Sequence, residues 1–123
     1  YAIAFAGRVV NPKLARLQLE GSALFGISNA LYEEMIFDDG QLTNPNLSDY
    51  SVISLGDVPI RFEVETLERD GEMRPHGLGE TTLPPVIAAL GNAVAAATGR
   101  RVRSHPLTPE RVLGLADEES GLG

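Results

Sequence analysis

Cysteine is absent from this 123-residue chain, and histidine occurs only twice, at His76 and His105. The first absence excludes disulfides and thiolate metal sites. Histidine, aspartate and glutamate also lack the helical or short-loop spacing of a metal site, so the sequence offers no metal ligands of its own. No apolar run reaches the length that a transmembrane helix needs.

Basic residues are scarce as well. Ten lysines and arginines stand against 17 acidic residues, which gives a net charge of −7. Binding to nucleic acid or to an anionic membrane needs a cationic surface, so this balance argues against both kinds of partner.

The chain is long enough for one compact domain. With 43% hydrophobic residues it can form its own core, and we place this domain at residues 1–115. Residues 116–123 contain Asp-Glu-Glu-Ser, and we expect them to be a disordered acidic tail. The chain begins with Tyr1 and has no signal-peptide pattern, which indicates either a removed leader or a piece of a longer protein.

A strand and a long helix are predicted first. Residues 1–6 are apolar and predict a buried strand, and Asn11 and Pro12 then suit the N-cap and first position of a helix. We expect this helix to continue to about residue 35, with Gln18 on the flank of an apolar stripe. The stripe should pack in the core and consists of Leu14, Leu17, Gly21, Leu24, Ser28, Leu31 and Met35.

The middle of the chain predicts strands. Asp39-Gly40 between apolar residues is a strong signal for a tight hairpin. Apolar and charged residues alternate over residues 60–66, which predicts a half-buried strand. Residues 69–72 have the composition of a solvated turn.

Two further helices are expected, one over residues 85–98 that ends at Gly99 and a short one that begins after Thr108. Three arginines follow the first of them: Arg100, Arg101 and Arg103. These cations would offset the negative end of the helix dipole, and a phosphate site is the alternative interpretation.

The order of these elements predicts an α+β fold, with one long and one shorter helix packed on one face of a small mixed sheet. The opening strand is apolar on both sides, and 123 residues leave little to cover its second side. We therefore expect a fragment of a larger domain, which hides this surface by self-association when it is isolated.

The most informative local feature is His76-Gly77-Leu78-Gly79-Glu80, directly ahead of the second helix. Glycines allow a ligand to approach the backbone because no Cβ stands in the way. A nearby helix N-terminus favours an ionised carboxylate, so Glu80 could act as a base. The alternative is a carboxylate that only caps the helix.

Short motifs follow one another from Gly7 to about Leu113. They include Gly7-Arg8-Val9-Val10-Asn11-Pro12, Gln18-Leu19-Glu20-Gly21, Leu31-Tyr32-Glu33-Glu34, Asp57-Val58-Pro59, Gly77-Leu78-Gly79-Glu80, Pro84-Pro85 and Ala97-Thr98-Gly99-Arg100. This succession resembles the C-terminal end of the molybdopterin-binding large subunit of the xanthine dehydrogenase and aldehyde oxidase family. The Ala-Ala-Thr-Gly-Arg-Arg-Val-Arg ending is most similar to the isoquinoline 1-oxidoreductase β-subunit branch.

The resemblance implies a molybdenum hydroxylase that oxidises an aldehyde or an N-heteroaromatic compound with oxygen from water. Its cofactor would be molybdopterin with molybdenum, as the cytosine dinucleotide in bacteria, held only by the full-length enzyme. The glutamate of the Gly-x-Gly-Glu motif is the catalytic base in the family, which corresponds to Glu80. Gln18 would contact the cofactor, and Gly79 would let the backbone lie close to the metal centre.

Implied partners are the rest of the large subunit, an iron–sulfur small subunit and a small-molecule substrate. The isolated chain would be inactive, and its compartment in bacteria could be the cytoplasm or the periplasm. For Gln18 the alternative is an amide that is satisfied between packed helices. For the whole chain it is a stand-alone structural or ligand-binding domain that kept the fold without the metal.

Three positions depart from the family pattern. Phe5 stands where an aspartate is usual, His76 where many relatives have lysine or glycine, and Thr81 where proline is frequent. These departures leave the substrate and the subfamily open.

Overall fold

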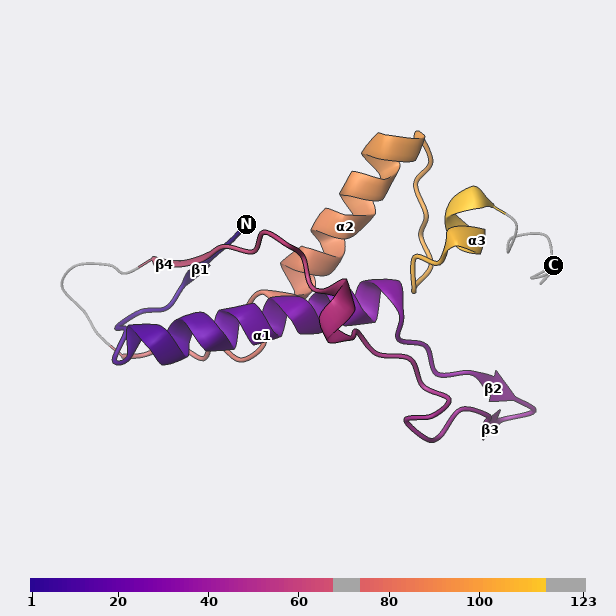
Figure 1. The fold of residues 1–123 in the computed structure, drawn as a ribbon, viewed down its shortest axis with the longest axis horizontal. Coiled ribbons are helices and arrows are strands. Elements are labelled where there is room, and N and C mark those ends of the chain that lie inside the picture. The colour runs from indigo at the N-terminus through magenta and orange to yellow at the C-terminus, as the bar shows by residue number, and fades with distance from the viewer. Residues whose placement is uncertain (68–73, 115–123) are drawn as a thin grey trace.

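The computed structural model describes residues 1–67 and 74–114. Its elements are β1 (Ala2–Phe5), α1 (Pro12–Leu31), β2 (Phe37–Asp38), β3 (Gln41–Leu42), the 3₁₀ turn η1 (Leu55–Asp57), β4 (Val64–Leu67), α2 (Leu83–Thr98) and α3 (Pro109–Leu113) (Figure 1). The predicted α+β class and the predicted order of elements are confirmed. The expected turn at 69–72, the domain boundary at 115 and the acidic tail lie outside the described residues.

Among the described residues, no helix combines the length and the apolar character that crossing a membrane requires.

Helix α1 begins where the sequence predicts but ends earlier. The Asn11 side chain accepts a hydrogen bond from the Leu14 N–H at 3.1 Å, and Pro12 occupies the first turn. The helix stops at Leu31 instead of near Met35, because the Asn44 side chain holds the following segment in an extended form. Its amide donates to the Glu34 carbonyl at 2.7 Å and accepts from the Ile36 N–H at 2.9 Å.

The buried face of α1 is not the predicted stripe. Leu14 and Leu17 are 58% and 52% exposed in this chain, and Ser28 is the only member of the stripe that is buried. Small residues dominate the face that is buried instead: Ala15, Leu19, Ser22, Ala23, Gly26, Ser28 and Ala30. Alanine, glycine and serine contribute little to the hydrophobic pattern from which a buried helix face is predicted. They nevertheless allow other segments to approach the helix closely.

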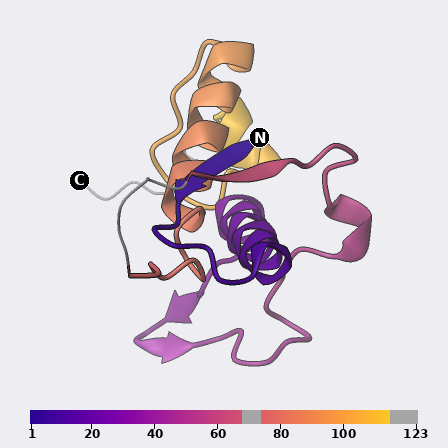
Figure 2. The same ribbon diagram turned by 90° about the vertical axis from the view of Figure 1, so that its left-hand side faces the viewer.

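Helices α1 and α2 cross at Gly26. A Cβ on Gly26 would lie 2.8 Å from the Leu83 carbonyl oxygen and 3.2 Å from the Val86 Cβ, so only glycine fits without a shift. Helix α2 begins two residues before the predicted position and ends at Gly99, as predicted, in the left-handed conformation with φ of 74°. Figures 1 and 2 show that α2 rises from this crossing, away from the long axis of α1.

The strands form two separate pairs. Strands β1 and β4 are parallel, with Ala2 opposite Val64 and Phe5 opposite Leu67. Figure 2 shows α1 beneath this pair. Within β1, Ala4 is buried while Ile3 and Phe5 are about half exposed, so only one side of the strand is covered in this chain.

The predicted hairpin and short helix are confirmed. Strands β2 and β3 pair through a two-residue turn in which Asp39 and Gly40 have φ of 45° and 77°. The Thr108 hydroxyl oxygen caps α3 by accepting from the Arg111 N–H. The strand expected over residues 60–66 is only partly formed, because regular pairing begins at Val64, where β1 supplies a partner.

The crossing gives a first test of this packing. Gly26→Ala should lower the free energy of unfolding by about 1–3 kcal/mol, because the added methyl group overpacks the contact with Leu83. Gly21→Ala in the same helix is the matched control, since its Cβ would meet nothing within 4 Å. The control should raise stability by about 0.5–1 kcal/mol through helix propensity. Urea denaturation measures both, and equal responses would contradict the close crossing.

Candidate functional site

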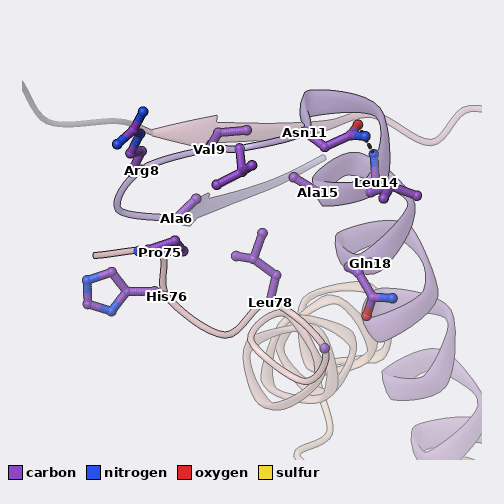
Figure 3. Close-up of a pocket in the computed structure, with 12 residues that line it drawn as sticks. Ala6, Arg8, Val9, Asn11, Leu14, Ala15, Gln18, Pro75, His76 and Leu78 are labelled. Carbon is purple, nitrogen blue, oxygen red and sulfur yellow. Dashed lines mark hydrogen bonds between the residues drawn. The ribbon is translucent and has the colours of Figure 1, made fainter. Parts of the chain in front are cut away.

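A groove of about 320 Å³ lies where β1 ends, α1 begins and the glycine loop passes. Figure 3 shows the side chains of these three segments around it. The lining residues come from the end of β1 and its connection to α1, from the first two turns of α1, and from the loop: Ala6, Arg8, Val9, Val10, Asn11, Leu14, Ala15, Gln18, Pro75, His76, Leu78 and Gly79.

Gly7 joins the loop to the end of β1. It has φ of 61° and forms an antiparallel bridge with Pro75, and the His76 N–H donates to the Ala6 carbonyl at 3.0 Å. A Cβ at Gly7 would collide with the Arg74 carbonyl and with the His76 ring. The first glycine of the Gly-Arg-Val-Val motif is therefore required both for its backbone conformation and for this close approach.

The structure brings Gln18 and Gly79 together, although 60 residues of sequence separate them. A Cβ on Gly79 would lie 3.5 Å from the Gln18 Oε1, so the missing side chain leaves the backbone open beside this amide. Gln18 is exposed, and its side chain makes no hydrogen bond within residues 1–67 and 74–114. It faces the glycine loop and the groove (Figure 3), so it is not an amide satisfied between packed helices.

Glu80 follows Gly79 directly but does not line the groove. Its side chain is exposed and forms no hydrogen bond or ion pair with the part of the chain that the structure describes. The N-cap of α2 is Thr82, and no side-chain hydrogen bond caps this helix. The helix-capping interpretation of Glu80 therefore fails, and its carboxylate is available for another role.

A buried threonine fixes the position of Glu80, and sequence reasoning missed it. Thr82 is 2% exposed; its hydroxyl donates to the Leu19 carbonyl at 2.9 Å, and its N–H donates to the Ser22 Oγ at 3.1 Å. Both partners lie on α1, within one turn of Gln18. A serine one turn after Gln18 was the available signal, but nothing in the sequence pairs it with a threonine 60 residues later.

The three departures from the family pattern make contacts in this region. The rings of Phe5 and His76 lie 5.4 Å apart at an angle of 51°, so two of the altered positions contact each other. The third, Thr81, donates its hydroxyl to the Gly77 carbonyl at 2.8 Å and closes the glycine loop. These contacts keep the loop ordered without the proline that is frequent after the glutamate.

The donors around the groove suit one side of an organic cofactor and not a metal ion. No group of three or more histidine, aspartate or glutamate side chains gathers anywhere in the described residues. The groove instead offers the Gln18 amide, which has no hydrogen-bond partner among the described residues, beside the open backbone of Gly79. Such a surface can hydrogen-bond a polar cofactor on one side, while other segments would have to supply the remaining walls.

Comparisons with known proteins agree with this description. Residues 1–59 match the family model of the molybdopterin cofactor-binding domain. The chain is 39% identical to the molybdenum-binding subunit of an Escherichia coli aldehyde oxidoreductase over 91% of this chain and 16% of that subunit. It is 41% identical to the E. coli O157:H7 xanthine dehydrogenase molybdenum-binding subunit over 87% of this chain and 15% of that subunit.

A solved structure shares the fold. Quinoline 2-oxidoreductase from Pseudomonas putida 86 superposes with a TM-score of 0.75 at 28% identity, over 94% of this chain and 16% of that one. The β-subunit of isoquinoline 1-oxidoreductase from Brevundimonas diminuta is also a relative, at 34% identity. The chain spans only 13–16% of the length of these relatives, so it aligns with one segment of a much larger subunit.

The anchor of the loop can be tested through Ser22. Ser22→Ala should leave the Thr82 N–H without a partner in a buried position and cost about 1–3 kcal/mol in the free energy of unfolding. Thr81→Val removes an exposed hydrogen bond of the same loop and should have a smaller effect. Amide hydrogen exchange reports the difference directly: exchange at Thr82 should accelerate in the serine variant, and unchanged protection would refute this anchoring.

Proposed function

We propose that this chain, which belongs to the xanthine dehydrogenase and aldehyde oxidase family, forms part of a molybdenum hydroxylase active site. Within the family it matches the molybdopterin-binding large subunits. One observation carries the proposal. The Gln18 amide and the Gly79 backbone meet at one groove, and Glu80, whose carboxylate has no partner in residues 1–67 and 74–114, follows directly in the chain.

Gln18 and Gly79 are the residues that would hold the cofactor. In the part of the chain that the structure describes, the Gln18 amide has donors and an acceptor without partners, and the open backbone at Gly79 permits a close approach. We propose molybdopterin with molybdenum, in the cytosine dinucleotide form, as the bound group. When bound, this group supplies a redox centre that takes up the two electrons removed from the substrate.

Glu80 would act as the general base. Its carboxylate would accept the proton released when oxygen from water is added to the substrate carbon. A positioned base of this kind typically contributes about 10²- to 10⁴-fold in rate. The hydrogen bonds of Thr82 to α1 fix the backbone two residues after Glu80, from which this side chain extends. A positioned base requires such a fixed backbone.

The reaction needs the rest of the enzyme. We propose that the remainder of the large subunit completes the cofactor pocket and that an iron–sulfur small subunit carries the electrons away. The substrate would be an aldehyde or an N-heteroaromatic compound. Exposed apolar side chains near the groove support the expectation that further segments cover this region. Leu14 and Leu17 are more than half exposed in this chain.

Paired variants of the full-length enzyme separate the two roles. Glu80→Gln should keep the molybdenum content and lower kcat by about 10²-fold or more, because only the base is lost. Gln18→Ala should lower the molybdenum content, because an amide contact to the cofactor is lost. Metal analysis and steady-state kinetics measure both. Activity within a few-fold of wild type for Glu80→Gln would rule out its assignment as the base.

The isolated 123-residue chain should bind no molybdenum, because one amide and one open stretch of backbone cannot hold the cofactor alone. It should also self-associate, because β1 and α1 expose apolar side chains. Metal analysis and light scattering of the purified chain test both expectations. Stoichiometric molybdenum would contradict the first, and a clean monomer would contradict the second.

A further inference from the structure

A second hollow, of about 380 Å³, lies between the end of α2 and helix α3. Figure 1 shows the connecting segment that runs from the end of α2 down to α3. Four of the ten basic residues of this acidic chain line the hollow, together with Val102 and Ser104: Arg100, Arg101, Arg103 and Arg111.

Two of these arginines are held in place by partners, of which one is neutral and one is a carboxylate. The Arg101 Nη1 donates to the neutral Asn92 Oδ1 at 3.0 Å. The Arg111 guanidinium donates to the Pro106 carbonyl at 3.1 Å and to the Glu34 Oε1 at 2.5 Å, which is the one carboxylate recorded against Arg101, Arg103 or Arg111 in the described residues. Within residues 1–67 and 74–114, the charges of Arg101 and Arg103 are therefore not offset by a carboxylate.

Arg103 adds a cation without any such partner. It is exposed, and its guanidinium has no hydrogen bond or ion pair with residues 1–67 or 74–114. Arg100 is already engaged and lies against Gly114, so the argument does not depend on it. Unlike Arg111, Arg101 and Arg103 pair with no carboxylate of the described residues and keep N–H donors for a ligand.

The helix dipole does not account for this cluster. The last turn of α2 contains no basic residue, and the arginines begin only after Gly99 has ended the helix. The interaction with a helix dipole falls off within the last turn. The guanidinium groups that follow Gly99 are therefore stabilised only slightly by the dipole of α2. Their mutual repulsion would instead be relieved by a bound anion.

The hollow is built on a fixed frame and is separate from the groove at Gln18. The Leu107 N–H donates to the Ala30 carbonyl at 2.7 Å, and Leu107 is buried, so the connecting segment is tied to the end of α1. Gln18 and Ala30 are twelve positions apart on α1, which corresponds to about 18 Å along the helix. The two sites are therefore at opposite ends of α1.

We propose that this arginine hollow binds a phosphoryl anion, with Arg101 and Arg103 as the principal ligands. Guanidinium groups match phosphate oxygens in a planar, two-pronged geometry that few other side chains offer. A volume of about 380 Å³ accommodates a diphosphate or the phosphate end of a nucleotide. This assignment stands on the arginines alone and does not depend on the proposed hydroxylase activity.

Isothermal titration calorimetry of the full-length protein with inorganic diphosphate at low salt tests the proposal. Wild type should show saturable binding, and Arg101→Gln or Arg103→Gln should each weaken it about tenfold, because each removes one charge-assisted contact. Arg61→Gln is the matched control and should bind like wild type, since Arg61 is exposed elsewhere and pairs with Glu63. No saturable binding, or equal binding by wild type and the double variant, would overturn the assignment.

The cofactor-free and cofactor-loaded forms distinguish two sources of the phosphate. Binding of diphosphate by the cofactor-free form alone would mean that the nucleotide arm of the cofactor fills the hollow. Binding by both forms would mean that a separate phosphorylated ligand does. Arg103 makes no hydrogen bond or ion pair in the described residues, so its variant should fold, and unchanged unfolding midpoints would verify this.

Discussion

The hydrogen bonds of Thr82 to α1 are the constraint on which the candidate site depends. They tie the start of α2 to the backbone and side chain of the long helix at Leu19 and Ser22. Because Thr82 is buried, breaking either bond would leave a polar group without a partner and without water. The glycine loop just before it must therefore pass Gln18, and Glu80 must emerge beside the groove.

Small residues make this arrangement possible. Gly26 lets α2 cross α1 almost at backbone contact, and Gly7 lets the loop join the end of β1. Gly79 leaves the backbone open next to the Gln18 amide. At each of these positions the missing side chain allows another segment of the chain to approach closely. Together they place segments that are distant in sequence around one groove.

The exposed parts of the chain fit its place in a larger protein. Apolar side chains of β1 and α1 are only half covered, and the groove has walls on one side. The chain spans 16% of the E. coli aldehyde oxidoreductase subunit that it matches, so most of such a subunit lies outside the aligned segment. The cofactor contacts and the base proposed here are consequently one part of a site that the remaining segments would complete.

Local chemistry in the sequence was enough for several elements. Asn11-Pro12, Asp39-Gly40, Gly99 and Thr108 each act through neighbours within a few residues, so their helix ends and hairpin could be predicted. The ordered motifs also identified the family and singled out Gln18, Gly79 and Glu80. The buried face of α1 and the early end of that helix could not be predicted in this way. Small residues carry almost no hydrophobic signal, and Asn44 acts on the helix end from a loop.

The sequence by itself determined the class of fold, the family and the residue types of the candidate site. Only the tertiary structure decided that Gln18 and Gly79 are neighbours, that Thr82 anchors the loop, and that Arg111 of α3 joins the arginines after α2. The physical reason is the range of the interactions. Caps and turns act over three or four residues, whereas these contacts join segments from distant parts of the chain. Close packing and long-range hydrogen bonds select them together.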